Sequence, residues 1–175
     1  MELSFRIVEE GTEDQEYVND LYVFSFPEPE RARFDHLMKV SKTDLGDLYV
    51  ILDVDKRVGM LHTMHRKDLV YVYYLAIDPG ERGKGYGSAI ITKLFSMYPD
   101  QRFALNCEAP DPKANNNEQR LERMAFYERN GFQDTGRRTM WEGVEYALMS
   151  HGGSIGRFEV NRLFSRAARI GRRGE

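Results

Sequence analysis

The feature that most constrains the fold is the stretch from residue 70 to residue 97, which changes character twice. Residues 70–78, VYVYYLAID, are almost continuously β-branched and aromatic, as is typical of a strand buried on both faces. The run ends at a Pro-Gly turn, and glycines then stand at positions 83, 85 and 87. An apolar stripe with helical spacing follows at once and stops before Pro99. A strand, a glycine-rich loop and a helix in this order predict an α/β chain.

The glycine-rich loop has the composition of an anion-binding site. Glycines let backbone N–H groups turn toward a ligand, and the start of a helix adds about half a positive charge. Arg82 and Lys84 contribute two further cations, which we expect to be mobile. The spacing does not fit a Walker loop, because the residue after Lys84 is Gly85, and it does not fit the dinucleotide fingerprint, whose third glycine falls on Ser88. A glycine-rich surface turn without a ligand is the alternative.

The other patterns predict strands and helices around this unit. Strands are expected at residues 3–10, at 47–66 as a pair that turns at Asp55-Lys56, at 102–108, and at 132–149 as a hairpin around Glu142-Gly143; helices are expected at 16–26, near 31–40 and at 115–130. Asn115 and Glu118 have capping-box spacing, and Gly131 suits the left-handed end of that helix. The order predicts a mixed sheet with helices on both faces.

Charge divides the chain into two parts. The protein has 175 residues, 41% hydrophobic and 30% charged, with a net charge of −3, which is typical of a single globular domain. Residues 157–175 contain six arginines and two glutamates, a charge of +4, so the preceding residues sum to −7. We therefore expect a domain over residues 1–151 and a basic, amphipathic, helical tail over residues 152–175.

A helical tail would have two faces. The apolar face would hold Val160, Leu163, Phe164, Ala167 and Ile170, and the opposite face would hold Arg162, Arg166, Arg169 and Arg173. Docking of the apolar face on the domain or on a second subunit is one interpretation, so a homodimer stays open. Contact of the basic face with an anion, a lipid or a nucleic acid is the other.

Composition also limits the partners and the compartment. The acidic start lacks the order of a signal peptide, and no apolar run approaches the roughly 20 residues of a membrane span. The single cysteine, Cys107, excludes an internal disulfide and a cysteine-based zinc site, and His62 and His65 lie three apart on a predicted strand, hence on opposite faces. We expect a cytoplasmic protein without a metal, and its net charge predicts no general attraction for nucleic acid or membrane.

The loop and its context resemble the signature of the GNAT superfamily of acyl-CoA-dependent N-acyltransferases. The segment LAIDPGERGKGYGSAII, residues 75–91, is similar to the family's loop, (Q/R)-x-x-G-x-(G/A), with Arg82, Gly85 and Gly87 at the defined positions. A second segment, RMAFYERNGF at residues 123–132, resembles the family's helix that ends in a tyrosine and is followed by Gly-Phe. The resemblance covers about residues 3–150. It implies a mixed, mostly antiparallel sheet that splays between its fourth and fifth strands.

The resemblance also implies where acetyl-CoA binds as the acyl donor. Backbone groups of the loop would bind the pyrophosphate, and the splayed strands would admit the pantetheine arm. The thioester would lie along Leu75, Ala76 and Ile77, and the loop residues are Arg82, Gly83, Lys84, Gly85, Tyr86, Gly87 and Ser88. Many members carry an asparagine where Arg120 stands here, and of the three asparagines just upstream we take Asn117 as the candidate for the pantetheine arm.

Direct transfer of an acetyl group to an amine requires three groups. The amine must lose a proton, the carbonyl oxygen needs a hydrogen-bond donor, and the departing thiolate benefits from a proton. Tyr127 matches the family's tyrosine and is the candidate acid, with a core aromatic as the alternative. Glu108, at the end of the 102–108 strand, is the candidate base acting through water, and capping a loop or pairing with an arginine is the alternative. A backbone N–H near Ile77, freed by an irregularity of the strand, would bind the oxyanion.

The acceptor amine is the least constrained part of the reaction. In this architecture the connection between the first two helices shapes the acceptor site, here residues 24–34, where Glu28 and Glu30 could attract a cation and Tyr74 could face it. A solvated loop is the alternative, and polyamine, aminoglycoside, amino acid and protein N-terminus all stay open as acceptors. Two other functions on this fold also stay open: an acyl-CoA-binding sensor without catalysis, and an interaction protein that acts through its basic tail.

Overall fold

The computed structural model describes residues 1–172, which form one seven-stranded sheet in the order β1-β2-β3-β4-β5-β7-β6. The strands are β1 (Leu3–Ile7), β2 (Gly46–Asp53), β3 (Lys56–Arg66), β4 (Leu69–Ile77), β5 (Arg102–Glu108), β6 (Gln133–Trp141) and β7 (Val144–His151). The described residues also form the helices α1 (Glu13–Ser25), α2 (Phe34–Val40), α3 (Tyr86–Met97), α4 (Asn117–Arg129) and α5 (Glu159–Arg172), with 3₁₀ turns η1 (Glu28–Glu30) and η2 (Pro79–Glu81). Among these strands only β4 and β5 pair in parallel. The prediction of a mixed, mostly antiparallel α/β sheet is confirmed.

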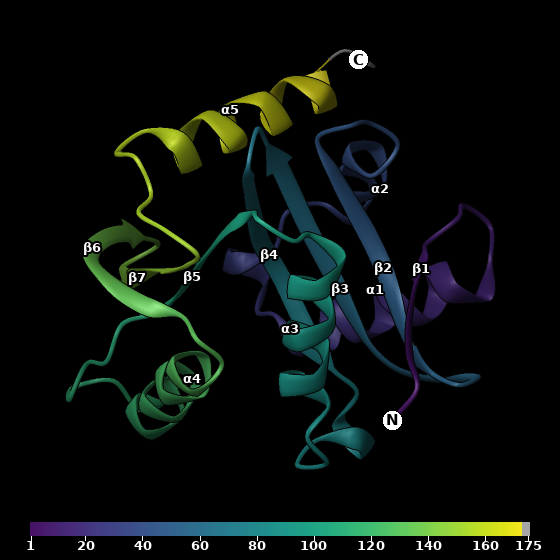
Figure 1. Cartoon of the computed structure of the whole chain (residues 1–175), viewed down its shortest axis with the longest axis horizontal. Coiled ribbons are helices and arrows are strands. Elements are labelled where there is room, and N and C mark those ends of the chain that lie inside the picture. Colours follow the sequence, from purple (N-terminus) through teal and green to yellow (C-terminus); the bar gives the residue numbers. More distant parts are fainter. Residues whose placement is uncertain (173–175) are drawn as a thin grey trace.

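The sheet splays between β4 and β5, as the family resemblance implies. The two strands pair only at their beginnings, where Leu69, Val70 and Tyr71 face Arg102, Phe103 and Ala104. Beyond Tyr71 the strands diverge, and Figure 1 shows them moving apart toward the end of the sheet where α3 begins. Within residues 1–172, the edge of β4 from Val72 to Ile77 therefore has no strand beside it on the β5 side.

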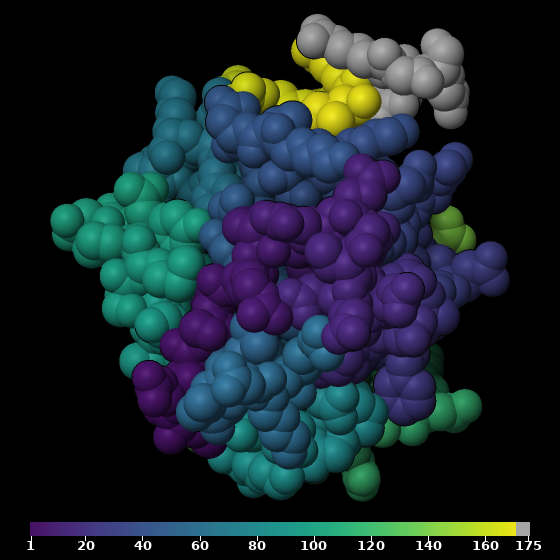
Figure 2. Space-filling model, turned by 90° about the vertical axis from the view of Figure 1, so that its right-hand side faces the viewer, coloured from purple at the N-terminus to yellow at the C-terminus, as the bar shows by residue number. Residues whose placement is uncertain are grey.

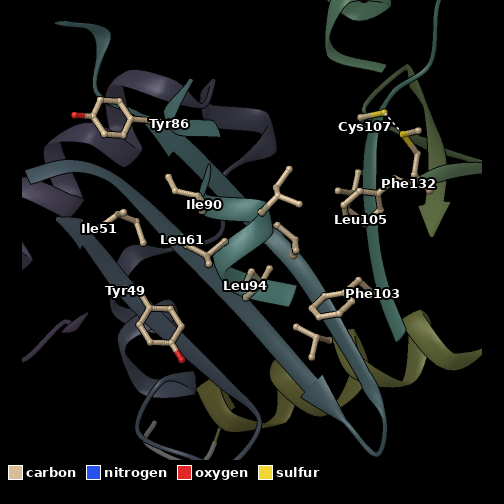
Figure 3. Close-up of a cluster of buried hydrophobic side chains, with 14 of the residues drawn as sticks. Tyr49, Ile51, Leu61, Tyr86, Ile90, Leu94, Phe103, Leu105, Cys107 and Phe132 are labelled. Atoms are coloured by element: carbon tan, nitrogen blue, oxygen red, sulfur yellow. Dashed lines mark hydrogen bonds between the residues drawn. The ribbon is translucent and has the colours of Figure 1, made fainter. Parts of the chain in front are cut away.

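Helices cover both faces of the sheet, because buried strand residues point alternately to each face. On one face, Val18 of α1 and Leu37 of α2 pack against Leu48, Val50 and Met60. On the other face, α3 lies over the place where the sheet splays. Figure 3 shows Ile90 and Leu94 projecting from α3 into the cluster that includes Leu61 of β3 and Phe103 of β5. The apolar side of α3 thus joins the two halves of the splayed sheet.

The C-terminal helix α5 docks on the end of the sheet where β3 turns into β4 (Figure 1). Its apolar face consists of Val160, Leu163, Phe164, Ala167 and Ile170, the five residues picked out by their spacing. Leu163 is completely buried. Arg162, Arg166 and Arg169 are exposed on the other face, and Arg173 lies outside the described residues.

One side chain fixes the start of α5. The Arg102 guanidinium donates to the Glu159 carboxylate at 2.8 and 3.0 Å and to the Asp68 carboxylate at 2.7 and 2.8 Å. Two bidentate pairs on one guanidinium define its orientation closely. The first turn of α5 is therefore connected both to β5 and to the β3–β4 turn.

Several local predictions can be compared with the structure. Gly131, with φ +88°, ends α4, and the Phe132 N–H bonds to the Tyr127 carbonyl, which confirms the left-handed end of the helix. The turn at Glu142-Gly143 is also confirmed. The β2–β3 turn is at Val54-Asp55, one residue earlier than predicted, because Asp53 pairs with Lys56.

The predicted capping box of α4 is wrong. The N-cap residue is Asn116, and its side chain makes no capping hydrogen bond. Instead its amide nitrogen donates to Glu108 and its oxygen accepts from Arg120 at 2.8 Å. The Asn116 side chain thus binds Glu108 and Arg120 and does not cap the helix. The spacing of Asn115 and Glu118 alone could not reveal these contacts.

Candidate active site

The glycine loop leaves the first turn of α3 without polar partners of its own. Gly83 and Gly85 have φ values of +76° and +86°, which only glycine adopts without strain. Gly85 is the N-cap of α3 and offers no side-chain cap, and the first helical hydrogen bond runs from the Ala89 N–H to the Gly85 carbonyl. The N–H groups of the preceding residues are therefore available to an anion at the positive end of the helix.

The two cations of the loop are both engaged, contrary to our expectation that they are mobile. Lys84 pairs with Glu81 at 3.1 Å, and Lys56 pairs with the same carboxylate at 2.5 Å. These two ammonium groups, Lys56 first, lower the pKa of Glu81. Arg82 donates to the Ile77 carbonyl at 3.2 Å, and its guanidinium lies over the Phe24 ring. Arg82 thus reaches back to the end of β4.

Tyr86 and Gly87, which follow the loop, face the rest of the fold. The Tyr86 ring lies at the edge of the cluster drawn in Figure 3, with its hydroxyl pointing away from that cluster. The hydroxyl donates to Asp53 at 2.7 Å, and this hydrogen bond is the first cause of its pKa being raised to about 12. A Cβ at Gly87 would lie 2.9 Å from the Phe126 ring. The third glycine therefore leaves room for the tip of the Phe126 ring against the first turn of α3. Ser88 is exposed beside them.

The irregularity in β4 lies at Tyr73, and its prediction near Ile77 is wrong. His62 pairs with Tyr74 and Thr63 pairs with Val72, so Tyr73 is the extra residue, while Ile77 pairs regularly with Gly59. A bulge leaves the extra residue's backbone outside the ladder. Tyr73 stands two residues beyond the last pair that β4 makes with β5. Leu75, Ala76 and Ile77 follow along the same free edge.

Tyr127 projects from α4 into the core cluster between the two halves of the sheet. Its ring packs edge-on against Phe126 and Phe132, and within residues 1–172 its hydroxyl makes no hydrogen bond. Burial is the first cause that raises the pKa of Tyr127 to about 12. The phenol is therefore protonated at neutral pH and has a free proton to donate.

Glu108 is buried and paired, the arrangement given above as the alternative to a base. Its side chain is 9% exposed and lies 3.1 Å from Arg123 and 3.4 Å from Arg120, and Asn116 donates to it at 3.2 Å. Arg120 also donates to the Ala109 carbonyl at 3.2 Å. The residue that stands at the family's asparagine position therefore connects the end of β5 to α4.

Asn117, the candidate for the pantetheine arm, has a local partner. Its side-chain oxygen accepts from the Asp111 N–H at 2.8 Å and so closes the turn before α4. Among the described residues it makes no hydrogen bond to the glycine loop. Its contact with the pantetheine arm stays a prediction.

The predicted acceptor residues Tyr74 and Glu30 lie together. The Tyr74 hydroxyl donates to the Glu30 carbonyl at 2.8 Å and accepts from the Ala32 N–H at 3.0 Å, which holds η1 against β4. The Glu30 carboxylate is half-buried and lies close enough to Tyr146 of β7 for each group to affect the pKa of the other. Burial first, and the charge of Glu108, raise the pKa of Glu30. Glu28 is exposed.

Two residues of the β6–β7 hairpin complete this region and were missed in the sequence. One is Tyr146. The other is Trp141, whose indole N–H donates to the Pro29 carbonyl at 3.1 Å. The hairpin pattern predicted the turn between these residues, but no sequence signal connects it with η1, because the contact joins positions more than a hundred residues apart. The candidate site thus uses both halves of the splayed sheet.

Comparison with known families identifies this arrangement. The family model described as the acetyltransferase (GNAT) domain matches residues 44–134, a segment that includes β4, the glycine loop, α3, β5 and α4. The chain belongs to the GNAT acetyltransferases. In this member the signature residues Arg82 and Gly85 lie in the loop between β4 and α3, and Gly87 lies in the first turn of α3. No curated protein sequence matches the chain significantly.

Solved structures share the fold. An acetyltransferase from the GNAT family of Bacteroides thetaiotaomicron is 22% identical with a TM-score of 0.75, covering 93% of this chain and 94% of its own. The spermidine/spermine N-acetyltransferase SpeG from Vibrio cholerae, in mutant forms, is 15% identical with a TM-score of 0.63, covering 95% and 98%. A GNAT acetyltransferase from Elizabethkingia anophelis with acetyl-CoA bound is 11% identical with a TM-score of 0.61, covering 86% and 97%. At these identities the likeness shows the fold.

Two kinds of feature are absent from the described residues. No helix within residues 1–172 is long and apolar enough to cross a membrane. The same residues hold no cluster of three or more histidine, cysteine, aspartate or glutamate side chains placed to bind a metal ion. His65 lies 3.0 Å from Asp47, whereas the His62 ring packs against Tyr73 and Tyr74.

Proposed function

We propose that this GNAT acetyltransferase moves an acetyl group from acetyl-CoA to a primary amine of a small molecule, by direct attack within a ternary complex. The observation that carries the proposal is the free edge of β4 leading into a glycine loop whose helix start lacks internal partners. A thioester arm can pair with such an edge as an added strand would. The loop then receives the pyrophosphate.

The donor occupies the loop and the free edge of β4. Gly83, Gly85 and the first residues of α3 present N–H groups to the pyrophosphate, and Arg82 and Lys84 add positive charge. Lys84 exchanges its pairing with Glu81 for a phosphate oxygen. Leu75, Ala76 and Ile77 hold the pantetheine arm through their main chain, and Asn117 stays the candidate for a side-chain contact with it. The neighbour crystallised with acetyl-CoA is consistent with this donor.

The transition state needs a donor for its oxyanion and an acid for its leaving group. We place the oxyanion donor at the bulge, where the backbone of Tyr73 lies outside the ladder. Tyr127 protonates the departing thiolate. Its raised pKa keeps the phenol protonated until that proton is needed.

A carboxylate must accept the proton of the ammonium. Glu108 acting through water is the assignment from the sequence. Its two arginine partners and Asn116 occupy its oxygens in the structure, however. Glu30 has no such cation partner within residues 1–172, and its pKa is raised, which brings it nearer to the operating pH of a general base. We therefore propose Glu30 as the base, with Glu108 as the alternative.

The acceptor is a small cationic amine. Glu30 and Tyr74 are held together at η1, with Glu28 at its exposed end, and the β6–β7 hairpin closes over them through Trp141. Carboxylates beside the reacting amine favour an acceptor that carries a further positive charge. The neighbour named for spermidine and spermine acts on amines of this kind. We assign residues 1–151 to the acetyltransferase unit and residues 152–175 to a tail that does not contact the reacting groups.

The test is release of CoA from acetyl-CoA in the presence of a panel of amines: spermidine, an aminoglycoside, an amino acid and a peptide with a free N-terminus. We expect amine-dependent release, fastest with the amine of highest charge. Thermal melting with acetyl-CoA at about 100 times its Kd should show about 2.7 kcal/mol of stabilisation in the wild type and none in Gly85→Asp. Stabilisation without release by any amine would identify a sensor in place of an enzyme.

A further inference from the structure

A second basic site lies far from the acetyl-CoA loop. Arg66 at the end of β3 and Arg162, Arg166 and Arg169 on α5, with Ser165, line a surface hollow of about 230 Å³. We call this the arginine hollow. Figure 1 shows α5 at the opposite end of the molecule from the turn that precedes α3, and Figure 2 shows α5 forming part of the surface above α2. The hollow is therefore separate from the site described above.

The charges of the arginine hollow are not neutralised by the protein. Within residues 1–172, none of its four arginines lies within 4.0 Å of a carboxylate, whereas Arg102 and Arg138 each pair at 2.7 Å. Asp44 lines a neighbouring hollow of about 260 Å³ that Arg166 and Arg169 also border, but it makes no ion pair with them. Four like charges around one hollow repel each other unless an anion lies among them.

The hollow is held in shape by the rest of the fold. Leu163 and Ala167 fix α5 on the sheet, and Arg102 holds its first turn through Glu159. Arg66 faces the helix from a different element, so the cations come from two directions. Along α5, the seven helical steps from Arg162 to Arg169 span about 10 Å, which is the length of a short chain of phosphate groups.

We propose that the arginine hollow binds a small, multiply charged phosphate anion. Guanidinium groups donate to phosphate oxygens in pairs, and the Ser165 hydroxyl adds a further donor. The apolar face of α5 is already buried in the protein, so the helix has no face left to insert into a bilayer. The charge of −7 on the residues before the tail repels an extended polyanion such as a nucleic acid. A compact oligophosphate avoids that repulsion.

The experiment is calorimetric titration of the full chain with inorganic tripolyphosphate in low salt. Because this probe also has affinity for the acetyl-CoA loop, it is titrated into Gly85→Asp as well as into the wild type. The hollow is tested with Arg162→Gln/Arg166→Gln and, from another element, with Arg66→Gln. The control is Arg129→Gln/Arg137→Gln, which removes the same charge from exposed arginines that make no ion pair within residues 1–172. Melting temperatures confirm that each variant is folded.

We expect Gly85→Asp to keep tripolyphosphate binding, the Arg162/Arg166 pair to weaken it by about 10-fold or more, Arg66→Gln to weaken it less, and the control pair to leave it unchanged. Loss of binding in Gly85→Asp alone would place the anion in the acetyl-CoA loop and overturn the proposal. Equal weakening by the control pair would show only a general charge effect and would also overturn it. Binding of single-stranded RNA or anionic vesicles in the absence of tripolyphosphate binding would assign α5 to a macromolecule instead.

Discussion

Neighbouring glycines of the loop are required for different physical reasons. A Cβ at Gly85 would make only an ordinary contact with the Met1 side chain at 3.6 Å, but the φ of +86° means that a side chain there costs backbone strain. Gly87 has an ordinary helical conformation, but a Cβ would lie 2.9 Å from the Phe126 ring. The first glycine is required by its backbone conformation, and the second by the packing of Phe126.

Gly87→Ala should therefore be the more damaging of two substitutions that each add one methyl group. We expect it to destabilise the fold by about 1–3 kcal/mol, because the Phe126 ring must leave its packed position, and Gly85→Ala to cost about 1 kcal/mol. Gly80→Ala is the control, because its Cβ would meet only Asp78 at 3.5 Å. Chemical denaturation measures all three, and equal losses for Gly80→Ala and Gly87→Ala would contradict the packing role.

The Tyr127 hydroxyl offers a clean separation of stability from catalysis. Because it makes no hydrogen bond within residues 1–172, Tyr127→Phe should change the melting temperature little. If the phenol is the acid, kcat falls by about 10²-fold while acetyl-CoA still stabilises the protein. Assays of CoA release and of thermal melting on the same preparation measure both effects. An unchanged kcat, with chemistry rate-limiting, would leave Tyr127 as a core aromatic only.

The two carboxylates near η1 are distinguished by their pH dependence. Glu30 acts as a base only when it is ionised, and its pKa is raised, so activity should be lost as the pH falls through that raised value. The negative charge of Glu108 contributes to the raised pKa of Glu30. Glu108→Gln should therefore keep activity and move the acid limb of the kcat/KM profile to lower pH, whereas Glu30→Gln should lose about 10²-fold in kcat. The opposite pattern would restore Glu108 as the base.

At the scale of elements, α5 connects the tail to the sheet and to the candidate site. Phe164 packs edge-on against Tyr71 and Tyr73, with ring centroids 5.4 and 5.0 Å apart. Tyr73 is the bulge residue, and it stacks on Tyr74, whose hydroxyl holds η1. A tail that looks like an appendage in the sequence thus supports the strand along which the reaction is proposed.

Leu163→Ala should destabilise the protein by about 2–5 kcal/mol, because Leu163 is completely buried and the substitution leaves a cavity between α5 and the sheet. Arg169→Ala, on the exposed face of the same helix, is the matched control and should stay within about 0.5 kcal/mol. Denaturant titration of both variants compares them directly. A small loss for Leu163→Ala would show that α5 is only weakly docked.

At the scale of the whole molecule, the two half-sheets are joined by several contacts. They pair along the short β4–β5 ladder, they share the apolar sides of α3 and α5, and they touch again where Trp141 donates to the Pro29 carbonyl. The helices provide apolar packing, whereas the Trp141 contact is a small polar one at the proposed acceptor site. The Trp141–Pro29 contact is therefore the one that we expect an entering amine to rearrange.

Trp141 is the single tryptophan of the chain and is 58% exposed, so fluorescence excited selectively at tryptophan reports on this region. We expect binding of the acceptor amine to shift the emission of Trp141, and binding of acetyl-CoA alone to change it less, because the glycine loop lies on another element. Trp141→Phe should raise the KM for the amine and leave the KM for acetyl-CoA unchanged. An emission that responds equally to the two ligands would contradict a local contact.

The sequence by itself determined the element order, the glycine loop and the apolar face of the tail, because each depends on spacing within one segment. The apolar run from Val70 to Ile77, the left-handed glycines and the end of α4 at Gly131 follow from local backbone chemistry. Only the tertiary structure decided which side chains meet across segments. It placed the bulge at Tyr73, paired Glu108 with two arginines and brought Trp141 and Tyr146 to η1. Such contacts arise from the packing of distant segments, which leaves no periodic trace along the chain.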